Sequence, residues 1–315
     1  MNIAIIGAGM AGLACGEALS RGGHSVTLFD KGRGPGGRMS TRRVPTALGE
    51  AAFDHGAQYF TVRDAGFAAR VDSWVAQGCV AAWPAAGSDA FVGVPGMNAP
   101  IRQMAAEATV HWGTRVTDIV VAGETGGWQI GVDGGTTHHA DAVIIAVPAE
   151  QAAVLVASIA PAMAALARKA TAAPCWTAMF AFAERLPMAI DCIRGEAADP
   201  LGWAARNNAK PGRSGPEAWV VQAGPDWSTA HLEDDGELIG ATLLAALADR
   251  IGGPLPAPIA QNTHRWRFAR SGSAGIPALW DGSRRIGMCG DWLIGPRVEA
   301  AWLSGTALGA MMGST

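Results

Sequence analysis

Two glycine-rich turns, one near each end of this 315-residue chain, have the residue types that bind phosphates and polar cofactors. Near the start, Gly7, Gly9 and Gly12 follow an apolar run over residues 2–6. In such a turn the first glycine permits a tight bend, the second lets the backbone approach a pyrophosphate, and the third lets helix and strand pack closely. A helix beginning at Met10 would direct free N–H groups and a positive dipole at the phosphates. This spacing predicts a dinucleotide site.

An acidic residue stands at the distance that a dinucleotide site requires. Asp30 lies 18 residues past Gly12 and ends a predicted strand over residues 25–30, where a carboxylate can bind ribose hydroxyls. With the strand over residues 2–6 and a helix over 10–20, this strand completes a βαβ unit. Because a carboxylate disfavours a 2′-phosphate there, FAD or NAD is preferred over NADP.

A basic, glycine-rich loop follows that strand directly and contains Lys31, Arg33, Gly37 and Arg38. Glycines let the backbone lie against a ligand, and a guanidinium can bind a phosphate through two hydrogen bonds. The alternative is a solvated basic loop. Its position after Asp30 favours phosphate binding.

The second glycine-rich turn lies close to residue 290. Gly290 and Asp291 end an apolar run, and Arg297, Val298 and Glu299 can open a helix of small residues. Asp291 could hydrogen-bond a polyol chain, and the helix N-terminus could stabilise charge near the N1–C2=O edge of a reduced flavin. The alternative is an ordinary docking helix. Together the two ends of the chain indicate a cofactor as long as FAD.

A further segment, residues 54–60, places small residues beside Gln58 and Tyr59. Small side chains permit close approach to a flat ring, and the amide and phenol could meet the polar edge of that ring. The alternative is the entry of a core strand.

Several elements must position these residues. The apolar run over 142–147 predicts another buried parallel strand, and residues 65–83 and 97–108 predict helices. Segments 115–121 and 128–132, joined by Gly-Glu-Thr-Gly-Gly, predict a hairpin. The middle of the chain predicts a helix over 237–251 and strands over 175–183, 201–205, 219–223 and 263–269.

The predicted fold class is therefore α/β. A Rossmann-type FAD-binding domain is expected over residues 1–63, 96–157 and 276–315. An inserted α+β substrate domain, built on a mostly antiparallel sheet, is expected over residues 64–95 and 158–275.

Composition narrows the class of protein. A net charge of −3 and a pI near 6.2 argue against bulk binding of nucleic acid or an anionic membrane. The five cysteines are scattered and never form CxxC, which indicates reduced thiols and neither a disulfide framework nor a metal site. The opening residues lack the basic region of a signal peptide, and Pro161 interrupts the Ala-rich stretch 152–167. A cytoplasmic protein is expected.

Together these motifs resemble the FAD-dependent amine-oxidoreductase superfamily and, within it, the renalase-type flavoproteins. The resemblance covers nearly the whole chain. Its more specific carriers are the Gly56-Ala-Gln58-Tyr59 segment and the block from Gly290-Asp291-Trp292 to Arg297-Val298-Glu299. It implies non-covalent FAD between a Rossmann-type domain and an inserted substrate domain. The implied cofactor-binding residues are Gly7, Gly9, Met10, Ala11, Gly12, Asp30, Lys31, Arg33, Gly37, Arg38, Gln58, Tyr59, Val116, Gly290, Asp291, Arg297, Val298 and Glu299.

The resemblance also implies a reaction. Renalase-type enzymes are similar to oxidases that take hydride at FAD N5 from isomeric 2- or 6-dihydroNAD(P), return NAD(P)⁺ and reduce O₂ to H₂O₂. Hydride transfer from a dihydropyridine needs no general base, because the product is an aromatic cation. The protein need only align donor and acceptor and exclude water.

Amine oxidation is the main alternative, and the residue inventory disfavours it. Many amine oxidases place a lysine near flavin N5, yet the lysines here are Lys31 in the phosphate loop, Lys169 in a helix and Lys210 in a Pro/Gly loop. Tyr59 is the only tyrosine, so the paired tyrosines of monoamine oxidases are impossible, although Trp or Phe could substitute.

Candidate substrate residues come from the expected substrate domain and from the segment before it. His264 and Trp266 alternate with Arg265 and Arg267, so one pair should face the cleft, and we predict the former. The predicted cleft set is Gln58, Trp203, Asn207, His264 and Trp266, with Arg206, Trp219, Gln222 and His231 as further candidates.

Three other activities stay open. The same superfamily contains amine or amino-acid oxidases and desaturases. A redox sensor or flavin isomerase would bind FAD without oxidase turnover. A plain NAD-dependent dehydrogenase would be colourless, whereas bound FAD is yellow.

Overall fold

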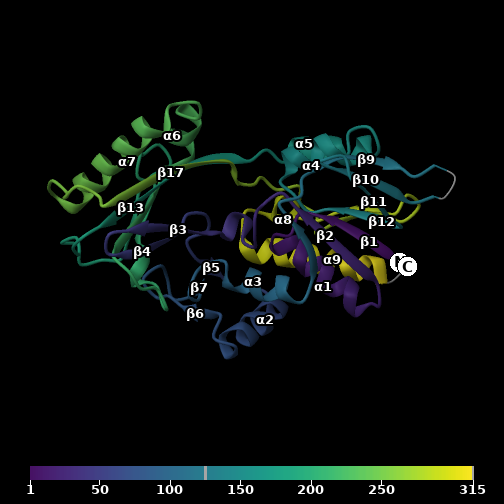
Figure 1. Cartoon of the computed structure of the whole chain (residues 1–315), viewed down its shortest axis with the longest axis horizontal. Coiled ribbons are helices and arrows are strands. Elements are labelled where there is room, and N and C mark those ends of the chain that lie inside the picture. Colours follow the sequence, from purple (N-terminus) through teal and green to yellow (C-terminus); the bar gives the residue numbers. More distant parts are fainter. Residues whose placement is uncertain (124–125, 314–315) are drawn as a thin grey trace.

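The computed structural model describes residues 1–123 and 126–313, and these form two lobes (Figure 1). One lobe is built on a six-stranded sheet in the order β18-β19-β12-β1-β2-β8. Its strands are β1 (Asn2–Ile6), β2 (Ser25–Asp30), β8 (Thr109–Trp112), β12 (Ala142–Ile145), β18 (Leu279–Asp281) and β19 (Ile286–Met288). All neighbours pair in parallel except β18 and β19. The sheet therefore brings strands from both ends of the chain together.

This sheet is buried on both faces, as its apolar strands predict. In β1, Ile3 and Ile5 pack toward α1 (Met10–Arg21) and α9 (Val298–Gly313), whereas Ala4 and Ile6 pack toward α4 (Ala149–Leu155). Helix α5 (Pro161–Lys169) and the small sheet of β9 (Val116–Val121), β10 (Trp128–Val132) and β11 (Thr137–Ala140) complete the second face. The predicted hairpin is thus β9 and β10, although residues 124–125 of its turn lie outside the described residues.

Helices α1 and α9 pack closely because small residues separate them. A Cβ added to Gly305 would lie 2.1 Å from the carbonyl oxygen of Ala11, and one on Gly309 would lie 2.5 Å from the Cβ of Ala18. The last helix therefore lies directly against the helix that follows the first glycine-rich turn.

The second lobe is built on a five-stranded antiparallel sheet in the order β14-β15-β16-β13-β17, which confirms the predicted fold class. Its strands are β13 (Ala173–Phe182), β14 (Cys192–Arg194), β15 (Trp203–Arg206), β16 (Glu217–Gln222) and β17 (Ala260–Arg270). Helices α6 (Pro225–Ala230) and α7 (Gly236–Ile251) lie along it (Figure 1). The hairpin of β3 (Thr41–Thr46) and β4 (Gly49–Asp54) also joins this lobe, because Ala51 and Phe53 pack against Met179 and Val220.

The segment after residue 60 differs from its prediction. Helix α2 (Ala65–Ala76) stops short of residue 83, because Gly78 takes a left-handed conformation (φ +72°) and the chain enters β6 (Val80–Ala82). Strand β6 pairs with β7 (Ala90–Gly93), which also pairs with β5 (Phe60–Thr61). This unit shares one hydrophobic core with α1 and with α3 (Ala99–Ala106).

The packing of two segments differs from the predicted domain boundaries. Phe67, Trp74 and Val92 lie in the core of the lobe that contains the six-stranded sheet, whereas the β3–β4 hairpin lies against the five-stranded sheet of the second lobe. We therefore propose that residues 64–95 belong to the cofactor-binding domain and residues 41–54 to the substrate domain. Within the described ranges, no helix is long and apolar enough to cross a membrane.

Candidate functional site

A cleft of about 2100 Å³ collects most of the residues that the sequence singled out. It runs along the carboxyl ends of β1 and β2 and reaches strand β17 of the second lobe. The predicted residues that line it are Gly7, Gly9, Met10, Ala11, Asp30, Lys31, Gly37, Arg38, Gln58, Tyr59, Val116, Trp203, His264, Trp266, Gly290, Asp291, Arg297 and Val298.

The three glycines of the first turn each meet a different requirement. Gly7 has φ +105°, and a Cβ there would lie 2.5 Å from the carbonyl oxygen of Ala146. A Cβ on Gly12 would overlap the carbonyl oxygen of Gly7 at 1.9 Å, so Gly12 permits helix–strand packing and does not line the cleft. A Cβ on Gly9 would have no neighbour within 4 Å among the described residues. The space beside Gly9, at the N-terminus of α1, fits a pyrophosphate.

Asp30 is fixed at the end of β2 by backbone donors. Its Oδ2 accepts a hydrogen bond from the Ala8 N–H at 2.8 Å, and its Oδ1 accepts one from the Gly32 N–H at 2.7 Å. A carboxylate has about four acceptor positions, so capacity for ribose hydroxyls remains. Asp30 is therefore suited to hold the adenosine ribose of FAD.

Arg38 and Asp291 join the two ends of the chain inside the cleft. Arg38, in the short helix η1 (Gly37–Met39), donates to both oxygens of Asp291, which begins α8 (Asp291–Ile294). The Ser271 hydroxyl also donates to Asp291, at 2.9 Å. The guanidinium predicted to bind phosphate and the carboxylate predicted to bind the polyol thus bind each other.

Besides Gly12, three predicted residues lie outside the cleft lining. Glu299 is buried and accepts hydrogen bonds from the backbone N–H groups of Arg63 and Asp64 at 2.6 and 2.8 Å, so it anchors α9 and does not line the cleft. Asn207 is buried and donates to the carbonyl oxygen of Ala52. Arg33 likewise falls outside the cleft lining.

Of the four further substrate candidates, one lines the cleft and three do not. Gln222 lines the cleft and donates to the Gly56 carbonyl at 2.7 Å. Arg206 is buried between Asp191 and Glu217, and Trp219 lies in the core of the second lobe. His231 caps α6 and stacks on Trp227.

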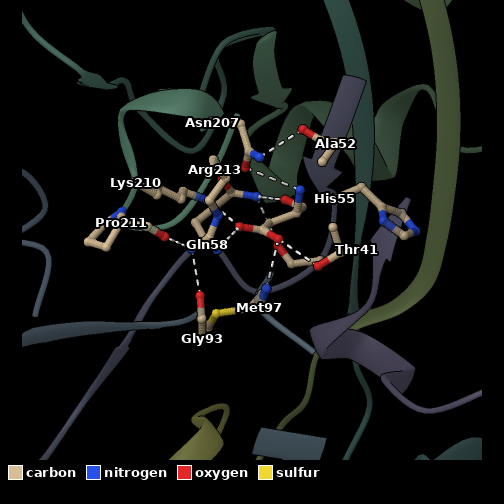
Figure 2. Close-up of polar contacts among 12 residues, drawn as sticks. Thr41, Ala52, His55, Gln58, Gly93, Met97, Asn207, Lys210, Pro211 and Arg213 are labelled. Atoms are coloured by element: carbon tan, nitrogen blue, oxygen red, sulfur yellow. Dashed lines mark hydrogen bonds and ion pairs between the residues drawn. The ribbon is translucent and has the colours of Figure 1, made fainter. Parts of the chain in front are cut away.

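A buried ionic cluster of Asp54, Lys210 and Arg213 lies next to Gln58, which lines the cleft. Figure 2 shows the polar contacts of this cluster. The Oδ2 of Asp54 accepts hydrogen bonds from Lys210 at 3.1 Å and Arg213 at 2.5 Å. Its Oδ1 accepts from the Thr41 hydroxyl at 2.7 Å and the Met97 N–H at 2.9 Å. Burial would raise the pKa of Asp54, but the two cations and these donors hold it far below its ordinary value.

Sequence reasoning missed the place of Lys210. Lys210 lies in the predicted Pro/Gly loop, directly after η2 (Asn207–Ala209), but its side chain is fully buried. It also donates to Gln58 Oε1 at 3.2 Å, and Gln58 lines the cleft. No local signal pairs Lys210 with Asp54, since 156 positions separate them.

Two neutral histidines and a tryptophan form another part of the site. His264 and Trp266 lie on β17, with ring centroids 4.4 Å apart, and both contact His55. Burial, followed by the charge of Arg42, lowers the pKa of His264 to about 4. Burial, followed by His264 and Arg42, lowers the pKa of His55 to about 4. Both imidazoles are therefore uncharged at neutral pH.

A ring pair lines a further stretch of the cleft. The rings of Tyr59 and Trp203 lie 5.5 Å apart, and the Arg194 guanidinium lies 4.7 Å from the Trp203 centroid. A flat substrate could stack here, since these faces combine apolar area with positive charge. Within residues 1–123 and 126–313, no group of three or more His, Cys, Asp or Glu side chains could hold a metal ion.

Comparisons with known proteins agree with this geometry. A family model described as an NAD(P)-binding Rossmann-like domain matches residues 5–77, and one described as flavin containing amine oxidoreductase matches residues 80–306. A 4,4′-diapophytoene desaturase of Staphylococcus haemolyticus is 52% identical over 40 residues, which are 13% of this chain and 8% of that protein. The chain thus matches only a small part of that relative.

Solved structures with the same fold cover the whole chain. A putrescine oxidase with bound putrescine superimposes with a TM-score of 0.76 and 14% identity, covering 100% of both chains. A cyclohexylamine oxidase from Brevibacterium oxydans superimposes with a TM-score of 0.71 and 13% identity, covering 99% of this chain and 98% of that one. At such identities the likeness shows the fold alone.

Proposed function

The chain belongs to the flavin-containing amine oxidoreductase family, and from this premise we propose that it oxidises isomeric 2- or 6-dihydroNAD(P), with O₂ as electron acceptor. FAD is the cofactor, and we propose that it is held non-covalently. When bound, FAD supplies hydride acceptance at N5, so that dihydronicotinamide, O₂ and one proton become NAD(P)⁺ and H₂O₂.

The charge of the cleft carries this proposal. Among the described residues that line it, nine are cationic and four are acidic, although the chain has a net charge of −3. The cations are Lys31, Arg38, Arg63, Arg115, Arg194, Arg265, Arg267, Arg270 and Arg297, and the acids are Asp30, Glu150, Glu196 and Asp291. Glu233, which pairs with Arg265 and Arg267, and Glu299, which pairs with Arg297, each offset one of these cations. The pyrophosphate of FAD would neutralise two more, and the positive charge that remains attracts phosphates and repels protonated amines.

The volume of the cleft supports the same class of substrate. Ligand pockets usually measure roughly 300–1,000 Å³. A cleft of about 2100 Å³ has room for FAD and for a second ligand of nucleotide size.

The side chains around the cleft suit a reaction that needs no base. His55 and His264 are neutral and add no charge, and His264 could hydrogen-bond a carboxamide. Trp266 donates its indole N–H to the His55 carbonyl at 2.9 Å, which ties β17 to the Gly56–Tyr59 loop. Tyr59 and Trp203 supply faces for a nicotinamide or adenine ring. These residues would align the substrate and exclude water.

Amine oxidation is the second candidate, and one observation favours it. Tyr59 and Trp203 form an aromatic pair beside the cleft, which is the substitution by Trp that a chain with one tyrosine would need. The charge of the cleft opposes this candidate, because an ammonium substrate would enter a positive field.

A comparison of donors tests the role of cleft charge. We expect kcat/KM for H₂O₂ production to be at least about tenfold higher for 6-dihydroNAD than for 6-dihydronicotinamide riboside, since only the dinucleotide carries phosphates. Equal values would remove the main support for the proposal.

A further inference from the structure

The Asp54 cluster carries more positive than negative charge. Lys210 and Arg213 both pair with the one carboxylate of Asp54, and all three side chains are at most 1% exposed. Figure 2 shows Lys210 and Arg213 approaching from one side, and Thr41 and Met97 from the other. The cluster as bonded therefore has a net charge of +1.

Among the described residues, Asp54 is the one carboxylate that acts on Lys210, and the carbonyl oxygens of Gly93 and Pro211 that accept from Arg213 carry no full charge. The charged and titratable groups that act on Lys210 are Asp54 on β4, Arg213 in the loop between η2 and β16, and Cys192 on β14. Burial raises the pKa of Cys192, so that thiol is neutral at pH 7. Burial lowers the pKa of Lys210 to about 8, and Arg213 adds to this effect, although Asp54 opposes it. A buried cation without full compensation is costly, which points to a counter-charge supplied from the cleft.

One side chain separates Lys210 from the cleft. Its Nζ lies 3.2 Å from Gln58 Oε1, while Gln58 Nε2 donates to the carbonyl oxygens of Asp54 and Gly56. Every polar atom of the Gln58 amide is thereby fixed. The Trp83 ring, 5.3 Å from Nζ, packs against Lys210. The charged groups of Lys210 and Arg213 thus lie in fixed positions on the side of Gln58 that faces away from the cleft.

We propose that Lys210 is a positioning residue that holds the Gln58 amide in the cleft wall and, with Arg213, places an excess positive charge behind it that favours the reduced form of bound FAD. Reduction adds electron density to the flavin ring, and positive charge nearby stabilises that state. This role requires FAD but is independent of the substrate, so it stands or falls separately from dihydronicotinamide oxidation.

The midpoint potential of the bound flavin tests the proposal. In the holoprotein, Lys210→Met should shift the equilibrium toward oxidised FAD by about tenfold, the order expected of one unit charge across one side chain. For a two-electron couple this is about 30 mV more negative. Lys210→Arg keeps the charge and should restore the wild-type potential. Lys169→Met, at the exposed end of α5, is the matched control and should change nothing.

The pH dependence supplies a second readout. Above about pH 8 the wild-type potential should fall further than that of Lys210→Arg, because a lysine amine loses its proton there and a guanidinium does not. This comparison decides the matter even if Lys210→Met fails to fold. The proposal is overturned if Lys210→Met matches the wild-type potential, or if wild type and Lys210→Arg show the same pH profile.

Discussion

Arg38 donates hydrogen bonds of 2.8 and 2.6 Å to the two carboxylate oxygens of Asp291, although 253 positions separate them in the chain. The pair connects η1, which follows β2, with α8, which precedes α9, and both residues line the cleft. The Asp291 side chain is 7% exposed and that of Arg38 is 32% exposed. Because Asp291 is nearly buried, its negative charge depends on the Arg38 guanidinium for neutralisation. Both ends of the chain therefore line one cleft, where we propose that FAD binds.

Removing Arg38 should weaken FAD binding. In Arg38→Met the Asp291 carboxylate would lose its ion pair and keep only the hydrogen bond from Ser271, and we expect the Kd of FAD to rise at least about tenfold, or ~1.4 kcal/mol. The fluorescence of released FAD measures this. Arg43→Met, which breaks an exposed pair with Glu50, is the control and should bind FAD as wild type does. Equal affinity in both variants would contradict a role for the Arg38–Asp291 pair.

Two alanine substitutions in the first turn should separate cofactor binding from folding. Gly9→Ala would put a methyl group into open space beside the cleft, so the protein should fold normally yet lose FAD. Gly12→Ala would overlap a backbone oxygen, and overpacking of this kind costs about 1–3 kcal/mol or more. The ratio of flavin to protein absorbance and the melting temperature distinguish the two effects. Retention of FAD by Gly9→Ala would refute the assigned pyrophosphate position.

The free energy of unfolding should begin to fall as the pH drops below about 6.5, which is above the range in which most carboxylates take up protons. The pKa values of His55 and His264 are about 4 in the folded protein, below the ordinary 6.5. As the pH falls through this window the unfolded chain takes up protons first, so the free energy of unfolding decreases. Each histidine contributes at most ~1.4 kcal/mol per pH unit, and His264 less because solvent screens its part-exposed ring. Urea denaturation of wild type and His264→Gln checks this, and the variant should depend less on pH.

Charge reversal at the cleft should affect dinucleotide oxidation selectively. Arg270 lines the cleft at the end of β17, and Arg270→Glu should lower kcat/KM for 6-dihydroNAD by about tenfold at low salt, with a smaller effect at high salt. Arg185→Glu reverses an exposed charge outside the cleft lining and serves as the control. An equal decrease in both variants would show that net charge, and not the cleft, matters.

The contiguous motifs were predictable from the sequence because local geometry determines them. Gly7, Gly9 and Asp30 lie within one βαβ unit, and a strand followed by a glycine turn and a helix allows few arrangements. His264 and Trp266 both contact His55 and line the cleft, as predicted, but Arg265 and Arg267 line it too, so the prediction that only one pair would face the cleft was wrong.

The remaining features depend on contacts between distant segments. Glu299 was expected near the flavin, but its Oε1 accepts hydrogen bonds from the backbone N–H groups of Arg63 and Asp64, and its Oε2 accepts one from Arg297. Lys210 belongs to no recognisable motif, and only the packing of β4 against the second lobe brings it to Asp54. Contacts between such distant segments produce no characteristic spacing that could be recognised in the sequence.

The substrate is tested most directly by mixing the purified holoprotein with candidate donors without oxygen and following the visible absorbance of oxidised FAD. We predict rapid bleaching by 2- or 6-dihydroNAD(P), no bleaching by putrescine or cyclohexylamine, and formation of H₂O₂ when O₂ is admitted. Rapid bleaching by an amine, with none by either dihydronicotinamide isomer, would contradict the proposed function.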